Sequence, residues 1–280
     1  MSFQVLMFLF GMWGFQVQAQ SLAMDYWTPP DYLSKNTHAL GYENYPFEVP
    51  EALKKDVQFW IEIYSKYTTH QGVFHLTGQT DQILGEIDLT DVYANQKWSP
   101  ARKEKEAELI IRIQKRLIAK RLNINKSDIR LQMGLKDRMQ EAIKISGYYL
   151  PMIEKIFQSQ KLPLELTRLV FVESSFNIHA GSKVGASGLW QIMPRLGRKF
   201  KYIKPSYDKR NHPYYATMGA ARILKENYQI LKSWPLAVTS YNHGVGSMLK
   251  IIKKYKSNDI AFLVDNVASK KSFGFASRNF

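Results

Sequence analysis

The sequence predicts a mainly α-helical protein, and two observations favour this class. Apolar side chains recur at helical spacing over residues 50–66, 100–121 and 213–231. Each of these segments opens at a proline, which is well tolerated in the first turn of a helix. Strand signals are weak throughout, and no internal repeat is present. A chain of 280 residues, 45% of them hydrophobic, is long enough for one large domain or two modest ones.

The upstream half of the chain, residues 20–146, is expected to be mostly helical and to begin with an extended arm. Residues 20–48 are rich in Tyr, Pro and Asn, which favours an extended arm over a packed element. Residues 50–66 then carry apolar side chains on one helical face. Those side chains are Leu53, Val57, Trp60, Ile61 and Tyr64.

A second upstream helix is expected to start at Ser99 and Pro100 and to end near Arg121. Its packed face comprises Ala107, Ile110, Ile111, Leu117 and Ile118. The opposite face is heavily charged, which predicts a helix at the protein surface. Residues 77–98 are interrupted by Gly and Asp and are ambiguous, whereas residues 133–145 are expected to be helical.

The downstream half, residues 147–280, is expected to contain further helices. The first should start at Pro163 and end near Glu173, because the Ser and Asn residues that follow favour caps and turns. Residues 213–231 predict another helix, in which small side chains allow close packing. Residues 234–242 predict a third, with Asn and Gly at its end.

The residues around Glu173 combine features that suit proton transfer. The next acidic residue along the chain is Asp208. Glu173 follows Phe171 and Val172 at the expected C-terminus of a helix. Apolar neighbours and the negative end of the helix dipole both disfavour the charged carboxylate. We therefore expect a raised pKa that keeps a proton available for donation, the alternative being an ordinary solvated helix-end residue.

Several motifs follow one another in a fixed order along the downstream half. They are Tyr149-Leu150-Pro151, Leu162-Pro163-Leu164-Glu165-Leu166, Glu173-Ser174, the run from Gly185 to Pro194, Asp208-Lys209-Arg210 and Ser240-Tyr241-Asn242-His243-Gly244. Over roughly residues 147–254 they resemble the SLT domain of family 1 lytic transglycosylases, above all the membrane-bound lytic murein transglycosylase D branch. The resemblance implies a lysozyme-like (goose-type) catalytic domain with an N-terminal helical region packed on it.

The same resemblance implies a reaction. Members of this family cleave the β-1,4 bond between N-acetylmuramic acid and N-acetylglucosamine in peptidoglycan and leave a 1,6-anhydromuramyl end without using water. By position, Glu173 looks like the catalytic residue that protonates the glycosidic oxygen and then takes the proton of the muramyl 6-hydroxyl. Most glycosidases use two carboxylates. Here the N-acetyl group of the substrate is thought to replace the second one, which fits the acid-free stretch after Glu173.

Five further residues match family positions that contact the glycan. They are Ser182, Gln191, Met193, Tyr241 and Asn242. The resemblance implies that Ser182 touches the N-acetyl group, that Gln191 binds the substrate and that Met193 lines the cleft. Tyr241 and Asn242 would face the acid and the sugar. Each has a structural alternative: a loop serine, an internally bonded Gln, a core Met, and a Tyr-Asn pair that packs and caps a helix.

Two features depart from the family pattern. Ser240 and His243 stand in a motif that often reads Ala-Tyr-Asn-x-Gly in this branch. His243 could bind a ligand or assist catalysis, the alternative being a packed or solvent-facing histidine. The family also carries a late tyrosine, whereas residues 273–280 contain phenylalanine and no tyrosine. Either a phenylalanine serves instead or the sequence is truncated.

The remaining composition bears on location and partners. Residues 1–19 are expected to be a secretory signal, with an apolar run and a small-residue cleavage site at Val17-Gln18-Ala19. The chain has no cysteine, which argues against a lipoprotein anchor, a disulfide or a thiol nucleophile. We expect a monomer without cofactor, metal or stable membrane anchor, in the periplasm or outside the cell.

The net charge of +15 suits a nucleic acid, an anionic membrane or an acidic polymer as partner. No nucleic-acid-binding motif is present, and peptidoglycan stems carry carboxylates. Basic residues gather just beyond the Glu173 motif: Lys183, Arg195, Arg198, Lys199, Lys201 and Lys204. They form either an ordinary solvated face or a surface for an acidic partner.

Three functions remain open at this point, and the sequence favours a lytic transglycosylase. A hydrolytic muramidase or chitinase-like glycosidase would need a second carboxylate or a positioned water, and Asp208 is instead expected to pair with Arg210 at a turn. A non-catalytic peptidoglycan-binding protein is the third, against which the intact Glu173 argues. Residues 77–129 are a candidate region for selecting a substrate or partner.

Overall fold

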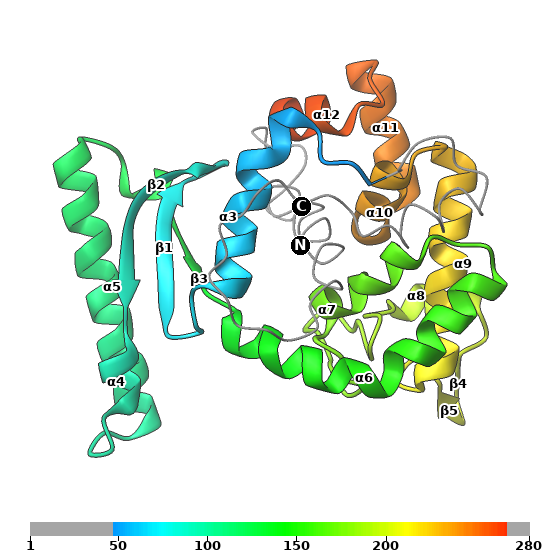
Figure 1. The fold of residues 1–280 in the computed structure, drawn as a ribbon, viewed down its shortest axis with the longest axis horizontal. Coiled ribbons are helices and arrows are strands. Elements are labelled where there is room, and N and C mark those ends of the chain that lie inside the picture. The colour runs from blue at the N-terminus through cyan, green and yellow to red at the C-terminus, as the bar shows by residue number, and fades with distance from the viewer. Residues whose placement is uncertain (1–46, 268–280) are drawn as a thin grey trace, which may run out of the picture. The chain divides into compact units, whose positions relative to one another are not determined.

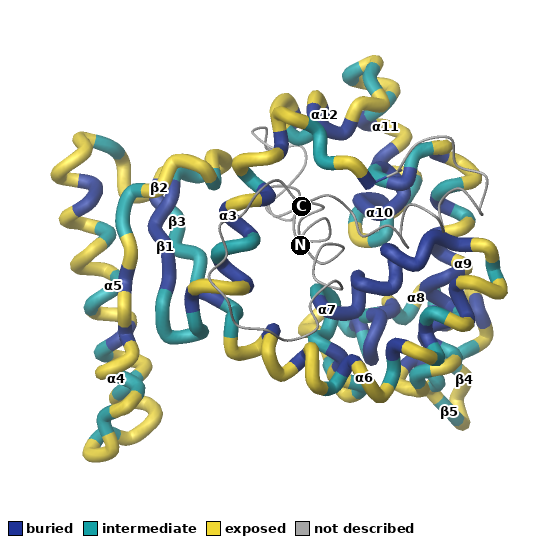
Figure 2. Tube along the Cα trace, in the orientation of Figure 1, coloured by how far each residue is buried: buried dark blue, intermediate teal, exposed yellow. Residues whose placement is uncertain are grey.

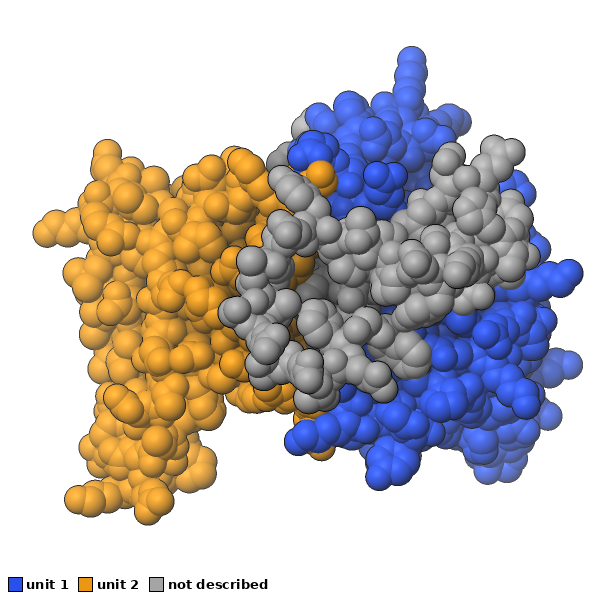
Figure 3. Space-filling view, viewed as in Figure 1, with its two compact units in different colours: residues 1–51, 142–280 blue, residues 52–141 orange. Residues whose placement is uncertain are grey.

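The computed structural model describes residues 47–267, shown as a ribbon in Figure 1. These residues divide into two compact units, coloured in Figure 3. The smaller unit contains residues 52–141, and the larger contains residues 47–51 and 142–267. The predicted secretory signal, most of the predicted arm and the phenylalanine-rich end region lie outside the described residues. The expected domain boundary after residue 146 and the expected packing of the upstream half on the downstream half stay predictions.

The smaller unit is built on a three-stranded sheet. In chain order its elements are η2 (Glu51–Leu53), α3 (Lys54–Ser65), β1 (Gln71–Leu76), β2 (Gln79–Asp88), α4 (Thr90–Ala94), α5 (Pro100–Leu122), η3 (Lys126–Asp128) and β3 (Ile129–Met133). The strands lie in the order β2-β1-β3 and pair antiparallel, with Gly72 opposite Ile87 on one side and Met133 on the other. The mostly helical expectation for this half therefore missed a sheet.

The weakness of the strand signals has a physical cause. β1 is buried over Gly72–His75, so it lacks the polar and apolar alternation of a half-exposed strand. β2 is largely exposed, and its register with β1 shifts between Phe74 and His75. The prediction of a helix from residue 133 was wrong at its start, because Met133 ends β3 and α6 begins at Lys136.

The helices predicted over residues 50–66 and 100–121 are confirmed, the first as η2 with α3 and the second as α5. The hydroxyl of Ser99 accepts the N–H of Arg102 at 3.3 Å and caps α5, which ends at Asn123 in the left-handed conformation. Ile118 and Ala119 of α5 pack in the core with Phe74, Ile87, Leu89, Ala107 and Ile129. Leu117 was wrongly placed on the packed face, because α5 turns its Ile118 side to the core and leaves Leu117 54% exposed.

The regular structure of the larger unit is helical except for one two-stranded hairpin, which confirms the predicted class. Its elements are most of α6 (Lys136–Ser159), η4 (Leu164–Arg168), α7 (Leu169–Glu173), α8 (Pro194–Lys199), β4 (Ile203–Lys204), β5 (Tyr207–Asp208), α9 (Pro213–Leu231), α10 (Trp234–His243), α11 (Val245–Tyr255) and α12 (Ile260–Val267). The predicted helices over 213–231 and 234–242 match α9 and α10. Figure 2 shows the continuous buried run, residues 162–171, that leads into α7.

Trp190 lies at the centre of this unit and is fully buried. Its ring stacks on Phe157 of α6 with centroids 5.4 Å apart, and its indole N–H donates to the hydroxyl of Thr217 in α9 at 3.0 Å. α9 also buries Ala216 and Ala220, whose small side chains let α10 pack close to it. The loop that carries Trp190 is therefore anchored on both α6 and α9.

The glycine-rich loop before α8, residues 180–193, depends on one close backbone approach. Gly188 has φ of +77°, and a Cβ added there would lie 2.2 Å from the backbone oxygen of Arg210. Gly185 also adopts a positive φ, of +87°. The two glycines therefore serve the backbone of a tight turn, which other residues would adopt only with strain.

We expect Gly188→Ala to lower the free energy of unfolding by about 3 kcal/mol, because the new methyl group meets backbone in a conformation that L-residues rarely adopt. Gly147→Ala in α6 is the matched control, since a Cβ there meets nothing within 4 Å. It should stabilise the protein by about 0.5–1 kcal/mol, as alanine usually does in a helix. Urea denaturation of both variants checks this, and equal effects would contradict the close approach at Gly188.

Candidate functional site

Glu173 is the last residue of α7, so the prediction of a helix end at this point is confirmed. Ser174 caps the helix, with its N–H directed to Val170 O and its hydroxyl donating to Leu189 O at 2.8 Å. The next two residues, Ser175 and Phe176, adopt φ of 51° and 61° and reverse the chain. Positive φ is costly at an aromatic residue, and surrounding structure must hold it.

Glu173 is half-buried. Burial disfavours its charged form and raises the pKa of Glu173 to about 7. A hydrogen bond from the Asn242 side chain acts in the opposite direction, because it stabilises the carboxylate. The raised pKa has the direction expected from the sequence, and a large share of Glu173 is protonated at neutral pH.

The C-terminal end of α10 brings Asn242 to this carboxyl group. Asn242 Nδ2 lies 3.3 Å from Glu173 Oε1, although 69 residues separate the two in the chain. The hydroxyl of Tyr241 donates to the backbone oxygen of Trp190 at 2.7 Å. Burial and the neighbouring charge of Glu173 raise the pKa of Tyr241 well above its usual value, so its phenol stays neutral. The structure thus brings Glu173, Tyr241 and Asn242 together.

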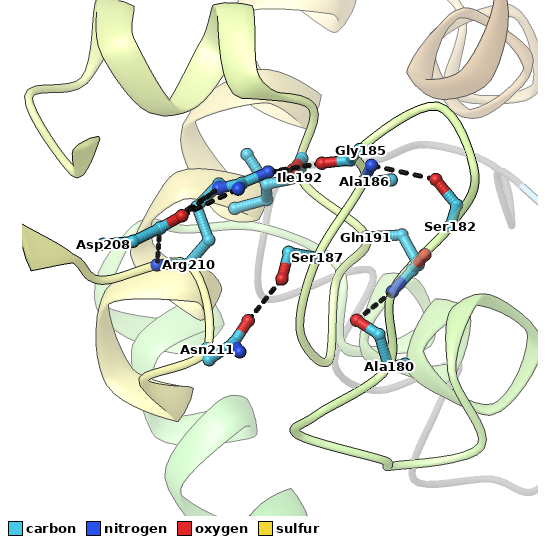
Figure 4. Close-up of polar contacts among 10 residues, drawn as sticks. All are labelled: Ala180, Ser182, Gly185, Ala186, Ser187, Gln191, Ile192, Asp208, Arg210 and Asn211. Carbon is cyan, nitrogen blue, oxygen red and sulfur yellow. Dashed lines mark hydrogen bonds and ion pairs between the residues drawn. The ribbon is translucent and has the colours of Figure 1, made fainter.

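Ser182 and Gln191 have contacts within the glycine-rich loop itself (Figure 4). The Ser182 hydroxyl accepts the N–H of Ala186 at 2.9 Å. The Gln191 amide nitrogen donates to Ala180 O at 3.1 Å and to Gly188 O at 2.9 Å. Both side chains therefore hold the shape of the loop, as their structural alternatives predicted. Neither has a hydrogen bond to Glu173 among the described residues.

Met193 ends the loop and stands immediately before α8. It is 40% exposed, so the alternative of a core methionine does not describe it. An exposed thioether beside a polar loop offers a soft apolar contact for a ligand.

Arg210 fixes the loop in a way that the sequence did not reveal. Its guanidinium donates to the backbone oxygens of Gly185 at 2.6 Å and of Ile192 at 2.9 Å, while Asp208 accepts from the same group (Figure 4). The predicted ion pair between Asp208 and Arg210 is confirmed at 2.7 Å. Arg210 hydrogen bonds hold the pKa of Asp208 below its usual value, so this acid is engaged as a charged structural group. The Ser187 hydroxyl, 2.5 Å from Asn211 Oδ1, adds another link.

Two further titratable residues lie buried near these elements. Glu165 of η4 is 2% exposed, and burial raises its pKa to about 7. Arg168 beside it pairs with Glu154 at 2.6 Å. His243 follows Asn242, and burial lowers its pKa to about 4, so its imidazole is neutral at physiological pH. The sequence singled out His243 but gave no sign of the burial of Glu165, because acid residues in short helices are mostly exposed.

This geometry supplies the components of acid–base chemistry at one carboxyl group. Glu173 can hold a proton at neutral pH and release it to an acceptor. Asn242 stabilises the carboxylate that remains, and Tyr241 keeps a neutral phenol beside it. The other downstream acid that the sequence raised as a partner, Asp208, is bound to Arg210.

Comparison with known proteins places this site in a known domain. The Transglycosylase SLT domain matches residues 151–263, which include Glu173 and all five further site residues. The membrane-bound lytic murein transglycosylase D of Escherichia coli (strain K12) is 35% identical over 102 residues, which is 36% of this chain and 23% of that protein. A putative tributyltin chloride resistance protein of Alteromonas sp. (strain M-1) is 32% identical over 128 residues, 44% of this chain and 62% of the relative.

The chain thus spans about a quarter of the length of the first relative and less than two thirds of the second. The matched part carries the whole Glu173 site, from α7 to the end of α10. Residues 151–263, which hold Glu173 and the five other candidate residues, thus match the transglycosylase SLT domain.

Proposed function

We propose that this protein is a peptidoglycan lytic transglycosylase. The observation that carries the proposal is the half-buried carboxyl group of Glu173, with a pKa of about 7 and Asn242 beside it, within a region that matches the SLT domain. The name of the Escherichia coli relative, a lytic murein transglycosylase, supports the same activity. Its substrate would be peptidoglycan, and it would cleave the bond between N-acetylmuramic acid and N-acetylglucosamine.

In the proposed reaction Glu173 acts twice. As an acid it gives its proton to the glycosidic oxygen, so the leaving sugar departs as an alcohol while the N-acetyl oxygen closes on C1 of the muramyl residue. As a base it then takes the proton of the 6-hydroxyl, whose oxygen bonds to C1 as the N-acetyl oxygen leaves. The proton returns to Glu173, and no water is consumed. A group with a pKa near the working pH serves both steps well.

The neighbouring residues would support this reaction in different ways. Asn242 would hold the carboxylate form of Glu173, and Tyr241 would orient the sugar from the same helix end. Ser182 and Gln191 would act by shaping the loop that faces the N-acetyl group, and exposed Met193 would contact a sugar ring. These assignments rest on the resemblance and on the contacts described above.

A hydrolytic glycosidase is the main competitor, because it also begins with protonation by Glu173. It needs a second carboxylate or a positioned water. Digestion of purified sacculi in ¹⁸O-labelled water separates the two functions by mass spectrometry. Unlabelled anhydro ends support the transglycosylase, labelled reducing ends support a hydrolase, and the absence of products supports a binding protein.

The proposal includes a location in the periplasm or outside the cell, where peptidoglycan lies, and a monomeric state. Within residues 47–267 no helix is both long and apolar enough to cross a membrane.

We expect Glu173→Gln to lower turnover on sacculi by about 10²–10⁴-fold, because an amide cannot donate the required proton. Glu165→Gln is the matched control, since Glu165 is a buried carboxyl that also has a pKa of about 7. It should keep most of the activity. Release of anhydromuropeptides is the measurement, and a Glu165 variant as inactive as the Glu173 variant would contradict the assignment of the acid.

The pH profile should report the protonation of Glu173. The protonated form is needed to start the reaction, so kcat/KM should fall as the pH rises through about 7. Asn242→Ala removes a hydrogen bond that favours the carboxylate, so the pKa of Glu173 should rise and the alkaline limb should move to higher pH. Asn258→Ala, on an exposed loop, should leave the profile in place. A limb that moves to lower pH in Asn242→Ala would contradict this account.

Tyr241→Phe should reduce activity and also cost about 1 kcal/mol of stability, because Trp190 O loses its hydrogen-bond donor. Tyr228→Phe controls for loss of a phenol on a neighbouring helix, α9. Thermal unfolding and turnover should be measured together. Full activity in Tyr241→Phe, with only stability reduced, would leave Tyr241 a packing residue.

A further inference from the structure

We propose that a basic and aromatic surface around the β4–β5 hairpin binds carboxylate-bearing glycan outside the Glu173 site. The hairpin surface consists of Arg198, Lys201, Lys204, Tyr207, Lys209, Tyr214 and Tyr215. The choice of ligand rests on the proposed function, whereas the surface itself is described by its charges, rings and links to the glycine-rich loop.

Most of the positive charge of this surface has no ion-pair partner among the residues that the structure describes. Residues 195–210 contain seven Lys and Arg and one acid, Asp208. Arg210 is paired with Asp208, and Lys199 is paired with Glu226 at 2.6 Å. Arg195, Arg198, Lys201 and Lys204 are exposed and make no ion pair with any residue that the structure describes. Their positive charge is therefore available to an anionic partner.

Tyrosine rings lie among these cations. Lys209 Nζ lies 4.3 Å from the ring centre of Tyr215 and 4.9 Å from that of Tyr207, and Lys204 Nζ lies 5.7 Å from Tyr207. Tyr214 is 47% exposed and packs edge-on against Tyr215 with centroids 5.6 Å apart. Tyrosine joins an apolar ring to a polar hydroxyl, which suits a sugar ring that has both kinds of surface.

This surface is firmly tied to the loop of the Glu173 site. Arg210 ends the hairpin segment and donates to the backbone oxygens of Gly185 and Ile192 (Figure 4). The N–H of Tyr202 bonds to Gly197 O of α8 at 2.7 Å, and α8 itself begins directly after Met193. A polymer held on the hairpin surface would thus be held by the same rigid part of the domain that carries the site.

The side chains favour a glycan over a lipid surface. Amphipathic segments that enter a membrane interface carry a row of exposed aliphatic or Trp residues beside their cations. In residues 195–215 the exposed large hydrophobic residue is Tyr214. Peptidoglycan offers amino-sugar rings together with stem-peptide carboxylates, which matches both the rings and the cations of the hairpin surface.

The test measures binding to intact sacculi by co-sedimentation, in a Glu173→Gln background so that no bond is cut. Arg198→Gln, Lys201→Gln and Lys204→Gln are combined in one variant. The control combines Arg112→Gln, Arg116→Gln and Lys120→Gln on α5, which removes the same charge from other exposed positions. Circular dichroism and thermal unfolding verify that both variants fold. We expect binding about tenfold weaker or more for the hairpin variant at low salt, and near-unchanged binding for the control.

Two further measurements identify the ligand chemistry and the role of the rings. Sacculi whose carboxylates have been converted to amides should bind the parent protein about as weakly as the hairpin variant does. Tyr214→Ala should weaken binding, whereas Tyr148→Ala, which removes an 85% exposed tyrosine from α6, should not.

Equal loss of binding in the hairpin and control variants would overturn the inference, because net charge alone would then explain it. So would unchanged binding to amidated sacculi. A hairpin variant that loses binding only to phosphatidylglycerol vesicles or to DNA, and not to sacculi, would assign the surface to another ligand and overturn it as well. Since no cleavage is needed, the outcome is separate from the ¹⁸O experiment that tests the proposed function.

Discussion

The buried indole of Trp190 is the interaction on which the larger unit depends. Trp190 joins three helices. Its ring stacks on Phe157 of α6, and its indole N–H donates to Thr217 of α9. Its backbone oxygen accepts the hydroxyl of Tyr241 in α10. The residue before it, Leu189, accepts the hydroxyl of Ser174 through its backbone oxygen. The position of Glu173 relative to Asn242 is thereby set by a core residue that itself carries no acid–base chemistry. A buried indole is a stable choice for this task, because its N–H is satisfied and its ring fills a large volume.

The same core creates the chemical property of the site. A carboxyl group placed at the end of a buried helix is desolvated, and its pKa rises. Asn242 limits that effect, because its amide stabilises the carboxylate that forms after proton transfer. The two influences oppose each other and leave the pKa near neutral, where a single group can serve as acid and then as base. The burial that raises the pKa of Glu173 also lowers the stability of the fold, since a buried polar group costs folding free energy.

The glycine-rich loop is held by polar contacts on both of its sides. Gln191 and Ser182 bond within it, and Arg210 reaches it from the hairpin segment. The contact of Gly188 with the backbone of Arg210 leaves no room for a side chain. One segment, residues 195–212, thus stabilises the loop through its buried Arg210 and exposes several basic side chains, among them Arg198, Lys201 and Lys204. The proposed glycan surface and the candidate site share this support.

The sequence alone determined the helical class and most helix starts and ends, and it singled out Glu173 as the candidate acid. Proline, serine and glycine act locally, so Ser99, Trp234-Pro235 and the end of α7 at Glu173 were predictable from neighbours in the chain. The ordered motifs around Glu173 pointed to the SLT domain before any contact was known.

The sheet of the smaller unit was missed, because β1 is buried on both faces and has no alternating pattern. Only the tertiary structure decided that Asn242 faces Glu173, that Gln191 and Ser182 turn inward to the loop, and that Arg210 binds Gly185 and Ile192. The contact of Asn242 with Glu173 and the contacts of Arg210 join residues far apart in the chain. Their geometry depends on how whole helices and loops pack, which local sequence preferences do not encode.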